Sequence, residues 1–325
     1  MINVLIIAAG HNKINGGIER HCASLIDLFK FHDAISLKTL DNQTCYQIPF
    51  MRKNFYRWMS IYRSLKKSDA DIIHIHGYLH ICAFQIIVCA KMLRKKVVLS
   101  PHFHPFKYLK HPFLGYLYFS ICIKPLLKCV SKIVTINSDD SCFFRKYNYV
   151  MIPHWIDRKN VETSNNIKRK DNFILFVGRN DCNKGLDHLY QLPSGKYEVH
   201  CVTSGKLLRS DFVQHINVTD QELNELYMKA SVLVVPSKYE AFSLVALEAL
   251  SKGCPIVISD RVRIADYLNA VSGVRIFKYG DYKCFLLSIQ DVICKKVDIK
   301  LVNEIFSKET IREKYFAMYQ SVLND

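Results

Sequence analysis

Several common signatures are missing from this sequence, and each absence narrows the class of protein. The twelve cysteines include no C-x-x-C pair and lie mostly in apolar segments, where a free thiol behaves as a small hydrophobic side chain. We therefore expect reduced cysteines, as in a cytoplasmic protein. No G-x-G-x-x-G and no G-x-x-x-x-G-K-S/T occurs, so the usual dinucleotide-binding and P-loop interpretations lose their main support.

Long hydrophobic runs are also scarce. The only long apolar stretch covers 113–130, and Lys124-Pro125 interrupts it before the ~20 residues that a membrane-spanning helix needs. The N-terminus has no basic region, and residues 2–9 are too few for the core of a signal peptide. We expect no segment that crosses a bilayer, and we interpret residues 2–9 as a first strand.

Acidic side chains are few in the first half of the chain. Residues 1–150 hold 21 basic and 8 acidic residues, whereas residues 151–325 hold 24 and 21, so +13 of the net charge of +16 lies in the first half. This asymmetry predicts an anionic partner for one half only, either a membrane surface, a phosphorylated lipid or a nucleic acid.

What the sequence does contain is a regular alternation of short apolar runs with segments of helical length. Runs that are apolar throughout fit parallel strands covered on both faces, because each parallel connection needs a crossover. The predicted strands are 2–9, 71–76, 97–100, 132–137, 173–178, 197–203, 232–236, 255–259 and 274–277. At roughly 100–200 residues per domain, the chain is predicted to be α/β with two doubly wound, Rossmann-like parallel-sheet domains.

A polar segment separates the two series of strands. Residues 151–171 contain Pro153 and the basic Lys168-Arg169-Lys170, which suits an exposed linker. We place the N-terminal domain at 1–160 and the C-terminal domain at 161–325, and the last helix could pack back on the N-terminal domain. Ligands of such domains bind outside the carboxyl ends of the strands, so two facing domains predict a cleft between them.

Two loops carry residues suited to phosphate. Gly16-Gly17 precede a helix start, where glycines allow close approach and free N–H groups can receive an anion, although a simple two-glycine turn explains them as well. In the second half, strand 173–178 delivers Arg179 to the carboxyl edge of the sheet, and Lys184 lies at the next helix start. These two cations predict a diphosphate site, and the alternative is a solvated basic turn.

The densest segment, 232–259, predicts a strand, a loop, a helix that ends at Gly253 and another strand. Ser243 lies near the helix start, where it can cap the free N–H groups of the first turn, which would face the same anion. Glu240 precedes this helix. Glu248 stands on its otherwise apolar surface, so its carboxylate must meet a partner or line a cleft.

Together these motifs resemble the family-4 retaining glycosyltransferases of the bacterial surface-polysaccharide type, whose GT-B fold consists of two facing Rossmann-like domains. The resemblance rests on Phe176 to Arg179 with Lys184-Gly185-Leu186, Glu240 to Glu248, Gly253 to Val257, Gly16 to Arg20, Ser100-Pro101-His102 and Ile152-Pro153.

The resemblance implies a UDP- or GDP-sugar donor held mainly by the second domain, an acceptor on the first, no metal and no cofactor. Arg179 and Lys184 would hold the diphosphate, Glu240 would lie beside the donor sugar, and His102 would line the sugar site. These four residues are the expected catalytic group.

The resemblance also implies a set of donor-binding residues. Glu248 would hydrogen-bond the ribose hydroxyls, and Gly16 and Gly17 would approach the donor from the other side. Backbone N–H groups near Phe242, Ser243 and Leu244 would contact phosphate or sugar.

Two segments depart from the family pattern. The usual Ile-Pro-Asn-Gly hinge reads Ile152-Pro153-His154-Trp155, and the usual Gly-Phe-Gly reads Ala241-Phe242-Ser243. Fewer glycines mean less backbone freedom near the donor, a change that bears on sugar identity more than on reaction class.

Two alternating histidine pairs stand outside these motifs, His74 with His76 and His102 with His104. No carboxylate or cysteine lies at ligand spacing, so we expect histidines that face the core or a cleft and no metal site.

A basic segment, 50–67, has aromatic residues at helical spacing. It predicts either a helix that lies on anionic lipid, extended by the aromatic stretch 103–119, or a solvated helix over the core. Its cations are Arg52, Lys53, Arg57, Arg63, Lys66 and Lys67.

The predicted function is a retaining, metal-independent hexosyl- or N-acetylhexosaminyl-transferase that acts on a lipid-linked or core oligosaccharide in O-antigen, capsule or lipopolysaccharide biosynthesis. It would be peripheral on the cytoplasmic face of the plasma membrane, with an anionic membrane surface as partner. One alternative is a non-catalytic sugar-nucleotide-binding partner of another glycosyltransferase. The other is a nucleic-acid-binding protein, which is disfavoured because no RNA- or DNA-binding motif accompanies the charge.

Overall fold

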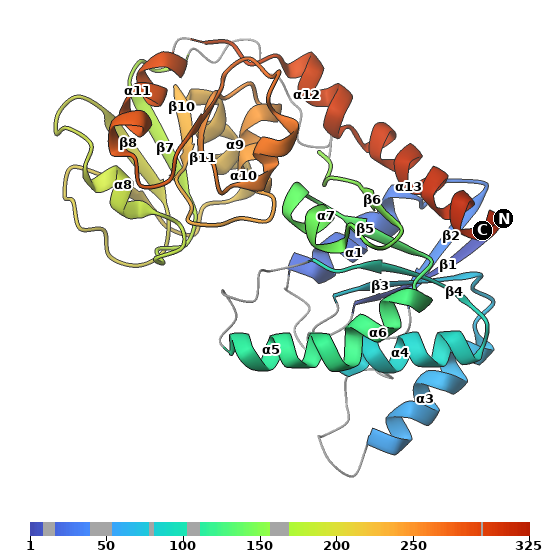
Figure 1. Ribbon diagram of the computed structural model, residues 1–325. Helices are drawn as coiled ribbons and strands as arrows, with labels where there is room; N and C mark the ends of the chain where they lie inside the picture. The colour runs from blue at the N-terminus through green and yellow to red at the C-terminus, as the bar shows by residue number, and fades with distance from the viewer. Residues whose placement is uncertain (9–16, 40–53, 78–80, 103–110, 157–168, 294) are drawn as a thin grey trace. The chain divides into compact units, whose positions relative to one another are not determined.

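The computed structural model describes residues 1–8, 17–39, 54–77, 81–102, 111–156, 169–293 and 295–325. The chain divides into two compact α/β units (Figure 1): unit 1 comprises Met1–Ile152 and Ile311–Asp325, and unit 2 comprises Pro153–Thr310. The domain boundary expected at 160/161 lies outside the described residues.

Unit 1 is built on a parallel sheet of six strands in the order β2-β1-β3-β4-β5-β6. Its central strands are rich in β-branched side chains and are buried on both faces, as parallel strands require. The strands are β1 (Ile2–Ala8), β2 (Ile35–Thr39), β3 (Ile72–His76), β4 (Lys96–Ser100), β5 (Lys132–Thr135) and β6 (Tyr149–Met151).

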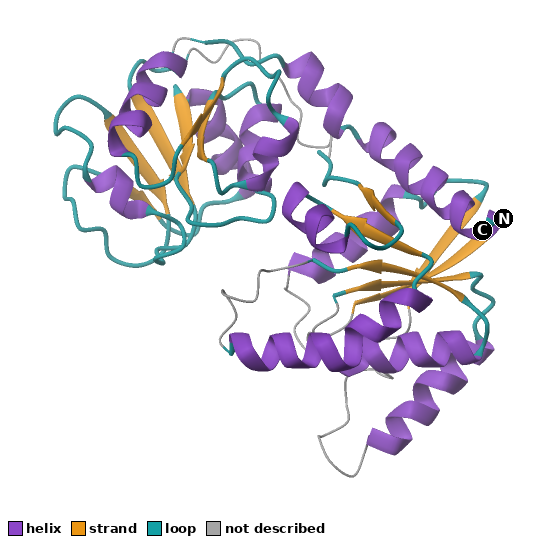
Figure 2. Ribbon diagram, in the orientation of Figure 1, coloured by secondary structure: helices purple, strands orange, loops and turns teal. Residues whose placement is uncertain are grey.

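Helices cover both faces of this sheet (Figure 2). Side chains alternate between faces along each strand, so Ile73 and Ile75 of β3 join the core beneath one helical layer, while His74 and His76 point to the other face. The first layer holds α3 (Asn54–Lys67), α4 (Ile81–Met92) and the continuous helix formed by α5 (Pro112–Tyr118), η2 (Phe119–Ile123) and α6 (Lys124–Leu126). The second holds α1 (Gly17–Leu28) and α13 (Lys308–Asn324).

Unit 2 repeats the architecture with the strand order β12-β11-β10-β7-β8-β9. Counted along the chain within the unit, this is the 3-2-1-4-5-6 order of the classical Rossmann fold. The strands are β7 (Phe173–Val177), β8 (Glu198–Val202), β9 (Val213–His215), β10 (Val232–Val235), β11 (Ile256–Ser259) and β12 (Val274–Phe277). The helices are α8 (Leu186–Tyr190) and α11 (Tyr282–Val292) on one face and α9 (Asp220–Lys229), α10 (Leu244–Ser251) and α12 (Ile299–Phe306) on the other.

The expected α/β chain with two doubly wound parallel sheets is confirmed, and nine of the observed strands lie where the sequence predicts them. The sequence analysis missed β2, β6 and β9. All three are edge strands with exposed or half-buried residues, so they lack the continuous apolar run by which a strand buried on both faces is recognised.

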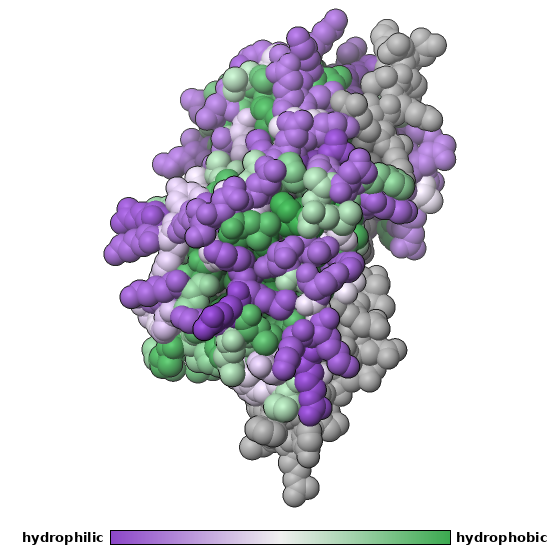
Figure 3. Space-filling model, turned by 90° about the vertical axis from the view of Figure 1, so that its right-hand side faces the viewer, coloured by the Kyte–Doolittle hydropathy of each residue, from purple (hydrophilic) through white to green (hydrophobic). Residues whose placement is uncertain are grey.

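No helix within the described residues is long and apolar enough to cross a membrane. On the face that Figure 3 presents, hydrophilic side chains surround separate, smaller hydrophobic areas.

Candidate functional site

The predicted cations of unit 2 lie at the topological switch point of its sheet, where the strand order reverses. Strands β7 and β10 are neighbours, yet the chain proceeds outward from them to opposite edges of the sheet. The connections that follow these two strands therefore lead to opposite sides of the sheet, and ligands bind outside the carboxyl ends of the strands at such a point in open α/β sheets. Arg179 and Lys184 follow β7, and Glu240 follows β10.

Backbone contacts lock these two loops together. The Lys238 N–H donates to the Asn183 carbonyl at 2.7 Å, and the Asn183 side-chain amide donates to the Tyr239 carbonyl at 2.9 Å. Gly185 adopts φ +71°, and a Cβ there would lie 2.0 Å from the Pro236 carbonyl oxygen. Only glycine fits at this crossing, so the position of Lys184 relative to Glu240 is set by the backbone.

Lys184 and Glu240 form an ion pair at this edge. The Lys184 Nζ donates to Glu240 Oε1 at 2.8 Å, and the Ser237 hydroxyl donates to the same oxygen at 2.6 Å. The side chains of Lys184 and Glu240 are 20% and 14% exposed, so the pair is partly withdrawn from water and its mutual attraction is stronger than that of a surface pair. The structure thus holds the Lys184 ammonium group in a fixed position in which it is partly exposed to solvent.

Arg179 is arranged differently. Its side chain is 80% exposed, and its guanidinium contacts the carboxylate of Asp181 at 3.3 Å. The structure pairs Lys184 with Glu240 and Arg179 with Asp181, and the two predicted cations occupy one loop with different carboxylate partners.

The residues before α10 divide between capping and packing. Ser243 is the N-cap, and its hydroxyl accepts a hydrogen bond from the Ala246 N–H at 3.4 Å, as the sequence predicts, while the Leu244 side chain is exposed. The Phe242 side chain is 4% exposed and meets the His154 ring edge-on, with ring centroids 5.0 Å apart. Burial lowers the pKa of His154 to about 4, so this ring is neutral at physiological pH. The two segments that depart from the family pattern are therefore in contact.

Glu248 is held by α9. Its carboxylate accepts a hydrogen bond of 3.0 Å from the hydroxyl of Tyr227, which is 1% exposed. Residue Glu248 is exposed as a whole, but its carboxyl group turns toward this buried hydroxyl. Desolvation raises the pKa of Glu248, and the Tyr227 hydrogen bond opposes that shift.

In unit 1, the predicted residues that the structure describes, Gly17 and His102, lie at the carboxyl edge of the sheet. Gly16 lies outside the described residues, and Gly17 is the first residue of α1. His102 follows β4, with φ +45°, and its Nε2 lies 3.0 Å from Nδ1 of His76. His74 faces elsewhere, toward the hydroxyls of Tyr319 at 2.7 Å and Ser100 at 2.8 Å.

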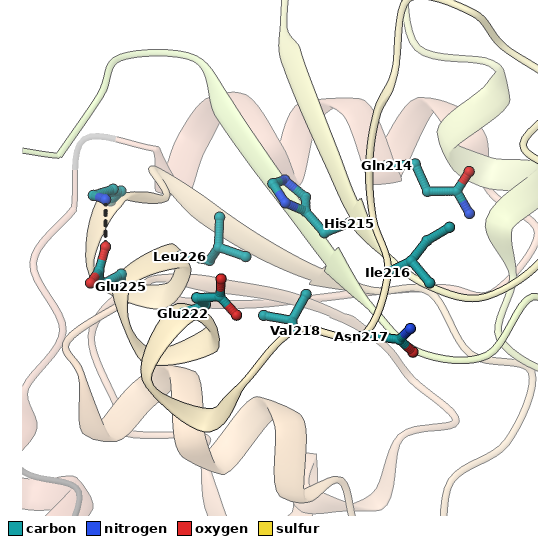
Figure 4. Close-up of a pocket in the computed structure, with 9 residues that line it drawn as sticks. Gln214, His215, Ile216, Asn217, Val218, Glu222, Glu225 and Leu226 are labelled. Carbon is teal, nitrogen blue, oxygen red and sulfur yellow. Dashed lines mark hydrogen bonds and ion pairs between the residues drawn. The ribbon is translucent and has the colours of Figure 1, made fainter.

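A further pocket of about 470 Å³ lies at the carboxyl end of β9 and along α9 (Figure 4). None of the predicted site residues lines it, and the sequence analysis missed it together with β9. Burial lowers the pKa of His215, and its neighbour His200 at 2.8 Å acts in the same direction. The capping-box pattern of Thr219 and Glu222 at the start of α9 is the signal that could have located this corner. The lining residues are Gln214, His215, Ile216, Asn217, Val218, Glu222, Glu225, Leu226 and Lys229.

Comparison with known proteins places this site in context. Residues 157–293, which include Arg179, Lys184, Glu240 and Glu248, match the family "Glycosyl transferases group 1". The match lies within unit 2, which is therefore similar to the glycosyltransferases of this group.

Two curated proteins are similar to this chain. An uncharacterized glycosyltransferase of Methanocaldococcus jannaschii is 28% identical over 141 residues, which cover 38% of this chain and 36% of that protein. An uncharacterized 41.2 kDa protein in the cps region of Klebsiella pneumoniae is 25% identical over 259 residues, 71% of each chain. The first match thus spans about a third of its relative, and the second spans most of it.

Solved structures show the same fold over the full length of the chain. A glycosyltransferase from Rickettsia africae superposes with a TM-score of 0.72 at 15% identity, covering 100% of this chain and 99% of that one. HepE from Anabaena, solved in complex with UDP and glucose, gives a TM-score of 0.67 at 13% identity, covering 99% and 100%. The fold class is therefore that of the GT-B glycosyltransferases, as the resemblance implies.

Proposed function

We propose that this protein is a retaining glycosyltransferase that moves a hexosyl or N-acetylhexosaminyl group from a UDP- or GDP-sugar to a lipid-linked or core oligosaccharide. The product would belong to a bacterial surface polysaccharide. The relative encoded in a capsule (cps) region favours capsule assembly among the three pathways considered.

The observation that carries this proposal is the Lys184–Glu240 pair at the switch point of unit 2. A departing nucleoside diphosphate gains negative charge as the glycosidic bond breaks, and fixed cations stabilise the charge that develops. Lys184 is held in place by Glu240, whose carboxylate also accepts a hydrogen bond from Ser237, before any ligand arrives, so little reorganisation is needed. Arg179, on the same loop and largely exposed, would close on the diphosphate from solvent.

The remaining groups take supporting roles in this proposal. Glu240 would lie beside the donor sugar, and the N–H groups at the start of α10, near Ser243, would add donors for phosphate. Glu248, oriented by Tyr227, would accept hydrogen bonds from the ribose hydroxyls. Retention of the anomeric configuration would follow if the acceptor hydroxyl attacks the face of the sugar from which the nucleoside diphosphate departs. The leaving phosphate would take the proton of that hydroxyl, so the transfer itself needs neither a protein base nor a cofactor.

A panel of sugar nucleotides, screened by thermal unfolding, would test donor binding. A ligand that binds only the native state raises the melting temperature, by an amount set by its concentration relative to Kd. The stabilising donor is then incubated with oligosaccharide-lipid acceptors. We expect release of nucleoside diphosphate and a product with the donor's anomeric configuration by NMR. Donor binding without any release would instead support a non-catalytic partner of another glycosyltransferase.

We propose further that unit 1 works at an anionic membrane surface. The apolar side of α3 is not available for lipid, because Ile61 and Leu65 are buried and Trp58 packs against Phe84. Its cations Arg63 and Lys67, with Lys66 between them, remain exposed.

The apolar contact would come from α5 instead. None of its residues is buried, and it continues into η2 within the same helical layer as α3. The large exposed side chains of this helix are Phe113, Leu114, Tyr116, Leu117 and Ile121. Exposed apolar side chains in the same layer as exposed cations are typical of helices that bind at a lipid interface.

Sedimentation with vesicles would test this location. We expect binding to vesicles rich in phosphatidylglycerol, weakened when Arg63, Lys66 and Lys67 are replaced by Gln and abolished when Phe113 and Ile121 are also replaced by Ser. A control variant loses three exposed cations from unit 2, Lys278, Lys283 and Lys300. Equal losses in both variants, or a salt-dependent shift of RNA with no vesicle binding, would refute the membrane role.

A further inference from the structure

A cluster of three histidines in unit 1 joins His102, which the resemblance places in the sugar site, to His21 and His76, which have no role in the proposed transfer chemistry. His21 lies on α1, His76 is the last residue of β3, and His102 follows β4. In the sheet order β2-β1-β3-β4, β1, the strand before α1, is the neighbour of β3. From β1 the chain continues to β2 on one side, and from β3 it continues to β4 on the other side. The three elements therefore converge at the carboxyl edge of unit 1, at its own switch point.

The three rings lie close to one another. One ligating nitrogen from each histidine lies within 4.8 Å of the other two, and Nδ1 of His76 is 3.0 Å from Nε2 of His102. The ring centroids form a nearly equilateral triangle, with 5.4 Å between His21 and His76, 5.2 Å between His21 and His102 and 5.3 Å between His76 and His102.

This triangle has the dimensions of a tetrahedral metal site. Three imidazoles bound to one Zn²⁺ at roughly 2.0–2.1 Å would place their nitrogens about 3.3–3.4 Å apart and their ring centroids about 5.2 Å apart. The rings already have that spacing, so small rotations about χ2 would bring the nitrogens to ligand distance.

The surroundings suit a metal as well. His21 is 8% exposed and His76 is fully buried, so two of the three ligands are withdrawn from bulk water, and His102 is partly exposed. His102 holds φ +45°, an uncommon backbone conformation for a residue with a side chain, and such positions cluster at functional sites. Imidazole ligands without carboxylates favour Zn²⁺, Cu²⁺, Ni²⁺ and Co²⁺ over Mg²⁺ or Ca²⁺.

We propose that His21, His76 and His102 bind one divalent transition metal ion, with Zn²⁺ as the first candidate and a fourth coordination position open to water or a substrate oxygen. The sequence analysis expected no metal, because no carboxylate or cysteine lies at ligand spacing from the pairs His74/His76 and His102/His104. It did not consider His21, which is 55 residues from His76 and shares no motif with it. The resemblance places His102 in the sugar site, so a bound metal would give that residue an additional role. Metal binding is measured without donor or acceptor, and its outcome therefore does not depend on the transferase assignment.

Metal binding by the untagged, full-length protein would test this proposal. After removal of bound metal with a chelator, we expect one equivalent of Zn²⁺ by calorimetry and the visible d–d spectrum of four-coordinate Co²⁺. His21→Ala and His102→Ala should each weaken Zn²⁺ binding by more than about 100-fold, since loss of outer-shell partners alone costs 10–100-fold. Far-UV circular dichroism confirms that each variant is folded. His76→Ala is tested in the same way, and His76→Gln replaces it if His76→Ala does not fold.

The matched control is His215→Ala. His215 pairs with His200 at 2.8 Å, and His200 contacts Glu198 at 2.8 Å, which makes this the competing metal-binding group in unit 2. Binding that survives His215→Ala and is lost in His21→Ala supports the proposal. The absence of stoichiometric binding, or binding lost only in His215→Ala, would overturn it and leave a hydrogen-bonded histidine cluster.

Discussion

Lys184 shows how a single side chain can be both neutralised and ready to bind. Its ammonium group is balanced by Glu240, which in turn accepts a hydrogen bond from Ser237. The carboxylate has two partners on one oxygen, so it fixes the position of the cation rather than only compensating its charge. An incoming diphosphate would meet a cation whose side-chain entropy has already been lost.

Replacing this cation tests the assignment at the level of one residue. We expect Lys184→Ala to lower kcat on the order of 100-fold if Lys184 stabilises charge on the leaving group. Lys283→Ala, which removes the same charge from an exposed position on α11, should leave the rate close to that of the wild type. Steady-state kinetics with the donor found by thermal screening provide the measurement, and a normal rate in Lys184→Ala would remove Lys184 from the mechanism.

The low pKa of His154 predicts that the free energy of unfolding depends on pH. Its pKa is about 4 in the folded protein, whereas an unfolded histidine titrates near 6.5. The neutral ring therefore contributes stability that is fully present above pH 6.5 and is lost as the pH falls toward 4, because the unfolded chain takes up the proton first.

Urea unfolding at two pH values measures this contribution. Between pH 7.5 and pH 5, the wild type should lose about 2 kcal/mol more than His154→Gln, at roughly 1.4 kcal/mol per pH unit below 6.5. Parallel losses in the two proteins would show that His154 titrates normally in the folded state.

At the scale of elements, unit 2 depends on groups that close helix ends. The guanidinium of Arg169 donates to the Ala230 carbonyl at 2.7 Å, just after α9, and to the Lys252 carbonyl at 3.0 Å, just after α10. One side chain thus satisfies carbonyls at the ends of the two helices that carry Tyr227 and Glu248. Lys and Arg commonly serve helix carboxyl ends in this way.

Removing this guanidinium should loosen both helices together. We expect Arg169→Met to lower the free energy of unfolding by about 2–4 kcal/mol, because hydrogen bonds from a charged donor are worth about 1.5–3 kcal/mol each. Lys170→Ala breaks only an exposed ion pair with Glu198 and should cost less than about 1 kcal/mol. Similar denaturation curves for the two variants would contradict this role.

The elements that were predictable share one property. Buried strands such as β7 and β10 are recognised in the sequence by unbroken apolar runs, and α10 is recognised by a capping serine and a terminal glycine. The edge strands were not predictable, because half-exposed strands carry mixed sequences, and the only sequence signal near the pocket beside β9 is the capping box of α9. His21 was missed for a different reason: only the packing of α1 against the sheet brings it to His76, and no local pattern encodes a contact across 55 positions.

At the scale of the whole molecule, we expect the excess positive charge and the donor-binding site to lie in different units. Donor binding is assigned to unit 2, and the excess of cations lies in the first half of the sequence. The chain has two tryptophans, and they fall in different units: Trp58 in unit 1 and Trp155 in unit 2. Each unit therefore has its own fluorescent reporter.

Two variants exploit this distribution. In Trp58→Phe, the remaining Trp155 should report a higher urea midpoint when nucleoside diphosphate is added, with about 2.7 kcal/mol of stabilisation at 100 times Kd. In Trp155→Phe, the remaining Trp58 should report a much smaller change. Equal shifts of both reporters would contradict a donor held mainly by unit 2.

Helix α13 has a consequence for the order in which the protein is made. Unit 1 includes residues 311–325, and within them Tyr319 is fully buried against His74 of β3. A ribosome delivers these residues only after every residue of unit 2 has been synthesised. The face of the N-terminal sheet that carries His74 therefore lacks this helix until residues 311–325 have been synthesised. The part of the protein that is synthesised first is thus the part whose folding is completed last.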